Sequence, residues 1–208
     1  MTMMQSRTST DPQARAKALE AHQRESRARC LNGIDLEQLR GAISAIEADA
    51  AAGQTRWNVR SQWMGGTRSD HQVEGFEIGG QFVRRPFTIK IDEPHELTGS
   101  NEYANPQEHL LAAMNACMMV GYAAVAGLMG MSLSKLEVVT EGEIDLRGFL
   151  GIDSATPAGY PKLRQTVHIA GDGTPEQFAQ LHETVKATSP NFYNITRAVE
   201  ADSRLIVQ

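Results

Sequence analysis

The sequence NPQEHLLAAMNACMMVGYAAVAGLMGM, residues 105–131, decides the fold, because it predicts one long apolar helix at the centre of the molecule. Asn105 is a good N-cap residue, Pro106 suits the first helical position, and Glu108 can complete a capping box with Asn105. Glycines near the end of the run weaken its last turn. The sequence therefore predicts a helix with a defined start that carries one thiol, Cys117, in its middle.

A membrane-spanning helix is the main alternative for this run. Leu110 to Met131 contains Asn115 as its only strongly polar side chain, and a run of this length is able to cross a bilayer. However, it is rich in Ala and Gly, and neither an excess of Lys and Arg nor a Trp belt flanks it. We therefore expect a buried core helix and no membrane partner.

Alternating apolar and polar residues on both sides of the helix predict strands. Before the helix, the glycine pairs Gly65-Gly66 and Gly79-Gly80 separate these runs and are typical of hairpin turns. Pro86 lies in the third run and predicts an edge strand, because proline cannot donate to a ladder. The expected strands are 57–63, 72–78, 82–91, 136–146, 163–169 and 204–207. Strands and helices are segregated along the chain, so the fold class is α+β with mainly antiparallel sheet.

The chain divides into three parts. Residues 1–13 are polar and predict a disordered N-terminus. Residues 14–53 predict a helical extension, in which Asp35 can cap a helix and Gln38 can complete its capping box. Residues 54–208 form the remaining domain.

Composition limits the classes of function. A formal charge of −5 over 208 residues provides no basic surface for nucleic acid or an anionic membrane. Two cysteines, Cys30 and Cys117, cannot build a disulfide framework, which indicates a reducing compartment such as the cytoplasm. The six histidines are scattered and have no zinc-ligand spacing, so we expect no metal.

Cys117 has two interpretations. It can be a small packing residue among Ala, Leu and Met, or it can be a shielded nucleophile that reacts as a thiolate. Apolar burial disfavours the thiolate, so a reactive Cys117 needs a nearby cation or hydrogen-bond donor. The turn that follows Gly65-Gly66 presents the guanidinium of Arg68, and Arg84 and Arg85 are the alternatives.

Glu108 cannot help Cys117 within one helix. It lies nine residues earlier, which at roughly 100° per residue places it on the opposite side of the helix. The rise of 1.5 Å per residue separates the two by about 13 Å along the axis. Our hypothesis is that they cooperate only across a two-fold interface between two copies of the helix.

Five motifs carry a family resemblance. They are Trp63–Arg68, Asp92–Leu97, Asn105–Cys117, Glu143–Gly148 and Ser189-Pro190. Together these motifs resemble the OsmC/Ohr family of thiol-dependent peroxidases and its OsmC-like relatives. The resemblance implies an OsmC-like fold for residues 54–208, in which curved, mainly antiparallel sheets wrap around central helices. It also implies an intertwined homodimer with active sites at the interface.

The resemblance further implies roles for single residues. Cys117 would be the peroxidatic thiol that an organic hydroperoxide oxidises to a sulfenic acid. Arg68 would hold the thiolate and would pair with the acid at the start of the central helix, here Glu108. No cofactor is implied, and the reductant would be an external low-molecular-weight or lipoyl thiol. An apolar pocket would favour alkyl hydroperoxides, because alkyl burial contributes about 25 cal/mol per Å². The residues expected to line it are Met114, Met118, Met119 and Tyr122.

Two departures from the family pattern point to a one-cysteine OsmC-like branch. Ser189 stands where the two-cysteine enzymes carry their resolving cysteine, so a sulfenic acid at Cys117 has no partner there. We expect Ser189 to N-cap the last helix instead. Glu108 lies one position later than the family's acid, which directly follows the proline. Cys30 is the remaining candidate for a resolving thiol.

Three functions stay open. The leading one is a thiol-dependent redox protein that reduces organic hydroperoxides through Cys117. The alternative is a non-catalytic protein that binds an apolar small molecule in the dimer cavity. A structural dimer with helical arms over residues 14–50 is the third. The substituted Ser189 and the shifted Glu108 favour binding, whereas the retained Cys117 and Arg68 favour chemistry.

Overall fold

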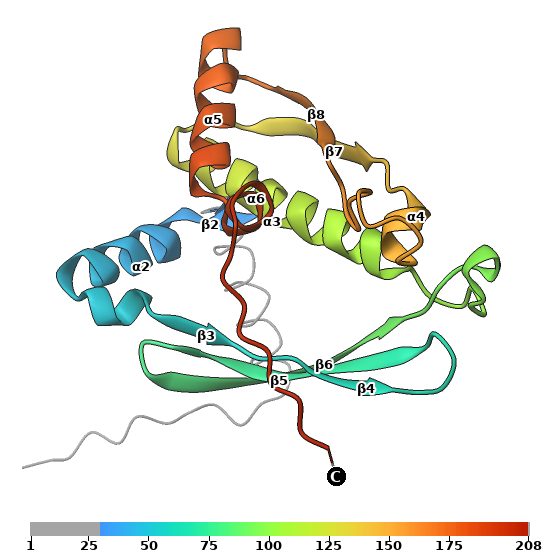
Figure 1. The fold of residues 1–208 in the computed structure, drawn as a ribbon. Coiled ribbons are helices and arrows are strands. Elements are labelled where there is room, and N and C mark those ends of the chain that lie inside the picture. Colours follow the sequence, from blue (N-terminus) through green and yellow to red (C-terminus); the bar gives the residue numbers. More distant parts are fainter. Residues whose placement is uncertain (1–29, 208) are drawn as a thin grey trace, which may run out of the picture.

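The computed structural model describes residues 30–207 (Figure 1). The predictions for residues 1–13 and for the first half of the helical extension lie outside the described residues. The strands are β1 (Cys30–Leu31), β2 (Ile34–Asp35), β3 (Thr55–Trp57), β4 (Arg60–Trp63), β5 (Ser69–Ile78), β6 (Gln81–Ile91), β7 (Leu133–Gly142) and β8 (Leu163–Gly171). The helices are α2 (Leu36–Ala48), α3 (Pro106–Leu128), α4 (Leu146–Phe149), α5 (Pro175–Thr188) and α6 (Pro190–Thr196), with 3-10 turns η1 (Ala50–Gly53) and η2 (His95–Leu97).

The central helix α3 begins where the sequence predicts. The Asn105 side chain accepts a hydrogen bond from the Glu108 N–H at 2.9 Å, and Glu108 Oε2 accepts from the Asn105 N–H at 2.7 Å. These reciprocal bonds satisfy two backbone donors at the start of the helix, so the predicted capping box is confirmed. By length and composition alone α3 could cross a membrane.

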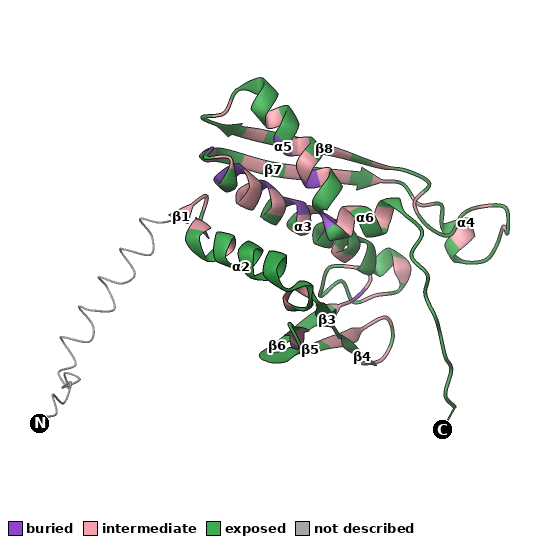
Figure 2. Ribbon diagram, turned by 90° about the vertical axis from the view of Figure 1, so that its left-hand side faces the viewer, coloured by how far each residue is buried: buried purple, intermediate pink, exposed green. Residues whose placement is uncertain are grey.

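One side of α3 is covered by α5, α6 and the β7–β8 hairpin, and we call this assembly the helical body (Figure 1). Strands β7 and β8 pair antiparallel along nearly their whole length. Figure 2 shows the buried residues along α3. The apolar core lies between α3, α5 and the hairpin and consists of Met118, Tyr122, Ala126, Met131, Leu181 and Val185. The helical body is therefore stabilised by its own core.

Strands β3 to β6 form a separate sheet, which we call the open sheet (Figure 1). The central strand β5 pairs with β6 along one edge and with β3 and β4 along the other. Strand β6, which contains Pro86, pairs with no other described strand, so the predicted edge position is confirmed. Large apolar side chains of this sheet are exposed, among them Trp57, Trp63 and Phe82.

The first described residues tie the two regions together. Asn32, at φ 55°, donates to the carbonyl oxygens of Ala123 and Met131 and accepts from the Leu133 N–H. These bonds fasten the β1–β2 hairpin to the end of α3. Asp35 then caps α2 by accepting from two backbone N–H groups, as predicted, and α2 leads away toward the open sheet (Figure 1).

Three predicted strands differ from the structure. The run 57–63 is two strands, because β5 shifts register between Val73 and Gly75 and the pairing breaks at the same level on both edges. A Cβ on Gly75 would lie 2.2 Å from the Val83 oxygen, so this irregularity requires glycine. The run 136–146 ends as a strand at Gly142. Residues 204–207 form no strand, because no described strand pairs with them.

Candidate functional site

The sulfur of Cys117 contacts the hydroxyl of Ser189. Cys117 lies half-buried in the middle of α3, and Ser189 Oγ donates a hydrogen bond to Cys117 Sγ at 3.4 Å. Ser189 is only 5% exposed. The fold thus brings the predicted nucleophile together with the residue at the substituted resolving position, although 72 residues separate them in the sequence.

Ser189 is aimed at the sulfur by the junction between α5 and α6. Its N–H donates to the Val185 oxygen at 2.9 Å at the end of α5, and its carbonyl accepts from the Tyr193 N–H at 3.0 Å at the start of α6. Its Oγ also accepts from the Phe192 N–H at 3.4 Å, which confirms the predicted N-cap. Backbone bonds on both sides therefore fix the direction of this side chain.

The same junction is held against α3 by two further contacts. Asn191 Nδ2 donates to the Ala113 oxygen at 2.9 Å, and in a regular helix that oxygen also accepts from the Cys117 N–H. One turn beyond Cys117, Gly121 lets α5 approach closely, since a Cβ there would lie 3.1 Å from Val185 Cγ1. The junction between α5 and α6 thus lies against the middle of α3, with Ser189 opposite Cys117.

Arg68 lies at the open sheet, in the turn between β4 and β5, and its ion pair is with Glu102. The Arg68 Nη1–Glu102 Oε2 distance is 3.6 Å, and both side chains are about half exposed. A pair of this kind contributes at most about 1 kcal/mol to stability. The implied partner Glu108 is instead engaged in the capping box of its own helix. The alternative cation Arg85 lies over the ring of Phe87, on β6.

Asp92 organises the surroundings of Arg68. Its carboxylate is fully buried and accepts from the Thr67 hydroxyl at 2.6 Å, from the Ser100 hydroxyl and N–H, and from the Glu102 N–H. The hydrogen bond from Ser100, followed by that from Thr67, holds the pKa of Asp92 well below its usual range. Because Thr67 precedes Arg68, this carboxylate fixes the turn and the Glu102 loop together. Asp92 belongs to the Asp92–Leu97 motif, but no spacing in the sequence indicates this role.

The four residues predicted to line a pocket do not share one surface. Met118 and Tyr122 belong to the core of the helical body, and Met119 is 37% exposed on another side of α3. Met114 lines a groove of about 530 Å³ that lies between α3, α6 and the start of β8. Its other apolar walls include Leu110, Leu163, Phe192 and Ile195. Met114 and Phe192 each lie one helical turn from the Cys117–Ser189 contact, but neither Cys117 nor Ser189 lines the groove.

Two polar contacts near the site had no signal in the sequence. The Tyr122 hydroxyl is hydrogen-bonded to His182 Nδ1 at 2.5 Å. Burial, with a smaller contribution from the charge of Glu183, raises the pKa of Tyr122 to about 12. Asn115 accepts from Thr140 Oγ1 at 2.6 Å and so ties α3 to the β7–β8 hairpin. Both pairs join residues that are far apart in the chain.

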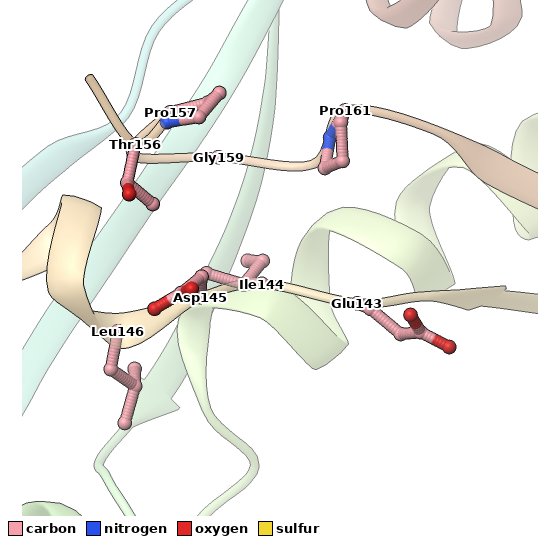
Figure 3. A pocket seen from close by; sticks show the side chains of 8 residues that line it. All are labelled: Glu143, Ile144, Asp145, Leu146, Thr156, Pro157, Gly159 and Pro161. Carbon is pink, nitrogen blue, oxygen red and sulfur yellow. The ribbon is translucent and has the colours of Figure 1, made fainter.

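A second cavity, of about 540 Å³, opens between residues 143–146 and 156–161 (Figure 3). Asp145 lies in its wall, but this carboxylate caps α4 and pairs with Arg147 at 2.6 Å. Neither Cys117 nor Arg68 lines this cavity. Within residues 30–207 no group of acidic, His and Cys side chains is placed to hold a metal ion.

Comparisons with known proteins agree with this architecture. The family model described as OsmC-like protein matches residues 99–204, just over half of the chain. The search of curated proteins found no match to this chain. An OsmC-like protein from Mycoplasma pneumoniae superposes with a TM-score of 0.54 at 12% identity, over 68% of this chain and 87% of that one. A Psychrobacter arcticus protein named for an osmotic stress induced and detoxification response gives 0.50 at 13% identity, over 64% and 84%.

Identities this low establish the likeness of the fold alone. The family match, by contrast, spans α3 with Cys117, the β7–β8 hairpin, and α5 and α6 with Ser189. All the elements that build the Cys117–Ser189 contact therefore lie inside the matched residues. On this match and on its α+β architecture, the chain belongs to the OsmC-like family.

Proposed function

We propose that this protein is a thiol-dependent redox protein that reduces organic hydroperoxides through Cys117. The observation that supports it most is the placement of the Cys117 sulfur, which is half-buried and in contact with a hydroxyl donor. A groove with apolar walls lies one helical turn away, at Met114 and Phe192, and could take an alkyl group. The name of the Psychrobacter relative, which refers to detoxification, agrees with this proposal.

The reaction proceeds in two stages. The Cys117 thiolate attacks the distal oxygen of ROOH, so an S–O bond forms while the O–O bond breaks. The sulfur is oxidised to a sulfenic acid, and the leaving alkoxide takes a proton from water to give ROH. One external thiol then displaces the oxygen as water and forms a mixed disulfide. A second thiol releases the Cys117 thiolate, and the net change is ROOH + 2 R′SH → ROH + R′SSR′ + H₂O.

An external reductant fits the residues around the sulfur. Ser189 cannot form a disulfide, and no disulfide joins Cys30 to Cys117. A low-molecular-weight or lipoyl thiol is therefore the reductant that we propose, with no bound cofactor. Two cysteines are too few for a disulfide framework, which agrees with the cytoplasmic location that we propose.

We further propose that the active unit is a homodimer. Apolar side chains of the open sheet are uncovered, and so is the face of α3 that carries Ala112, Ala116, Met119 and Val120. Arg68 and Cys117 also lie in different regions of the chain, each with another partner. A second copy would cover these surfaces and could supply Arg68 to the neighbouring Cys117.

The non-catalytic alternative has one observation in its favour. The groove of about 530 Å³ is within the size range of small-molecule sites and has apolar walls. In that case an apolar ligand would occupy the groove and Cys117 would be a packing residue. The rate at which the protein consumes a hydroperoxide separates the two proposals.

The test is consumption of one equivalent of cumene hydroperoxide by the reduced full-length protein. We expect thiol loss much faster than for a free thiol, and a dimedone adduct on Cys117 in the intact mass. The Cys30→Ser variant should keep this rate, and Cys117→Ser should abolish it. Consumption no faster than that of free cysteine would reject the peroxidase and leave ligand binding as the function.

A further inference from the structure

We propose that the Ser189 hydroxyl is a catalytic residue, which donates the hydrogen bond that holds Cys117 as a thiolate. This inference rests on the proposed function, because it names a second group at the same reacting sulfur. In the sequence Ser189 is only a substituted resolving position and an N-cap. In the structure its oxygen touches the sulfur at 3.4 Å, a distance at which a hydroxyl can bond to sulfur.

The direction of the hydroxyl proton follows from its other bond. A serine hydroxyl has one proton to donate and lone pairs with which to accept. Ser189 Oγ accepts from the Phe192 N–H, so its lone-pair side is directed toward α6. Its proton is then available for Cys117 Sγ. Because hydrogen bonds to an ionised partner are stronger than neutral ones, this donation favours the thiolate over the thiol.

The charged and titratable groups in the second half of α5 are engaged with one another or with α3. Lys186 pairs with Glu183 at 2.9 Å, and His182 bonds to Tyr122. Helix α6 contains neither Lys, Arg nor His. Within the described chain, Ser189 is therefore the polar group that is positioned on the sulfur.

The donor is also held in place before any reaction takes place. The backbone of Ser189 is bonded in both flanking helices, Asn191 binds the Ala113 oxygen on the same turn of α3, and Gly121 admits α5. A donor fixed in this way needs no reorganisation when charge is present on the sulfur. Because Asn191 and Gly121 hold the α5–α6 junction against α3, loss of either contact should weaken the hydrogen bond from Ser189 without removing its hydroxyl.

A hydroxyl donor also leaves the oxidised sulfur accessible. Ser189 forms no covalent bond to the sulfenic acid, so the S–OH group stays open to an incoming thiol. The substitution Ser189→Cys would instead place a second thiol beside the sulfur. Attack of that thiol on the sulfenic acid would form a disulfide and release water, with no further oxidant. We expect this variant to lose the dimedone adduct and to gain an internal disulfide.

The test measures alkylation of Cys117 by iodoacetamide against pH in the full-length protein, with Cys30→Ser as the background and no peroxide present. We expect Ser189→Ala to slow alkylation at neutral pH by about tenfold, because the thiolate loses its hydrogen-bond donor. Ser189→Thr, which keeps a hydroxyl, should retain the parent profile. Because the assay uses no peroxide, its outcome is independent of whether the protein is a peroxidase.

Ser189→Asp separates the donor from the helix cap. Aspartate caps helices as well as serine does, but its carboxylate cannot donate and repels a thiolate. The donor role predicts that this variant is alkylated most slowly of the series at neutral pH, whereas a purely structural role predicts the parent rate. Asn191→Ala should slow alkylation less than Ser189→Ala does. The proposal is overturned if Ser189→Ala and Ser189→Asp, both folded by circular dichroism, keep the parent profile.

Discussion

The helical body and the open sheet cover their apolar residues in opposite ways. In the helical body Met118, Leu181 and Val185 are completely buried between α3, α5 and the β7–β8 hairpin. In the open sheet Trp63 is 74% exposed and Trp57 63% exposed. Large exposed apolar patches of this kind mark interaction surfaces. One chain thus buries the core of the first region, whereas the apolar side chains of the sheet, like those on the outer face of α3, stay uncovered.

The proposed site is divided along the same line. The nucleophile Cys117 and its donor Ser189 belong to the helical body, whereas the cation Arg68 and its organiser Asp92 belong to the open sheet and the loop after it. The sulfur and its hydroxyl donor thus meet within one chain, whereas Arg68 lies in the other region and pairs there with Glu102.

The largest effect on stability should come from truncation in the helical body. Leu181→Ala removes a fully buried side chain from the core, and we expect it to lower the free energy of unfolding by about 2–5 kcal/mol. The matched change in the open sheet is Phe87→Ala, at a residue that is 55% exposed. In dilute protein it should have an effect of about 0.5 kcal/mol or less. Urea unfolding of both variants measures the difference, and equal losses would contradict the comparison.

The next largest effect should concern assembly. Phe87→Glu places a charge on the open sheet, and we expect it to weaken self-association by at least about tenfold, because an unpaired charge in an apolar interface is strongly unfavourable. Light scattering over a dilution series measures this. Val139→Glu on β7, at a residue of similar exposure in the helical body, is the control and should leave the mass unchanged. A monomeric parent protein would refute the proposed dimer.

Removal of the Arg68 guanidinium should separate activity from stability. We expect Arg68→Ala to slow peroxide consumption by roughly 100-fold, as loss of a charge-stabilising group does in other enzymes. The free energy of unfolding should change by less than about 1 kcal/mol, because the pair with Glu102 is exposed and 3.6 Å long. Arg85→Ala is the matched control on β6. If Arg85→Ala slows the reaction and Arg68→Ala does not, the assignment of the cation is wrong.

Asp92 should make stability depend on acid pH. Its hydrogen bonds keep its pKa low in the folded protein, whereas in the unfolded chain a carboxyl of this type takes up a proton near about pH 3.9. Asp92 therefore contributes stability above this pH and loses it as the pH falls toward its own low pKa. Below about pH 4, Asp92→Asn should reduce the number of protons taken up on unfolding by about one, so the stability of this variant should fall less steeply with decreasing pH. Urea titrations at neutral and acid pH measure this, and parallel curves would contradict it.

The sequence predicted the parts of this molecule that depend on neighbouring residues. The capping box of α3, the edge position of β6 and the caps at Asp35 and Ser189 follow from short-range chemistry, and the structure confirms them. The family resemblance of the chain was also confirmed.

Long-range contacts follow from no spacing rule, because they depend on how distant segments fold together. Only the family resemblance related Ser189 to Cys117, and nothing in the sequence indicated the four donors on Asp92. The expected strand 204–207 failed for a related reason. Its apolar residues have strand character, but a strand requires a partner for its backbone, and the described chain provides none.

The smallest expected effect on stability tests the second half of the site. Glu108→Gln keeps a side chain that can accept from the Asn105 N–H, so the capping box survives and unfolding should change by only about a few tenths of a kcal/mol. The carboxylate charge is lost, however. If a second copy brings Glu108 to Arg68 of its neighbour, as the family resemblance implies, peroxide consumption should fall although stability does not. An unchanged rate would leave Glu108 as a helix cap alone and would make Glu102 the acid that accompanies Arg68.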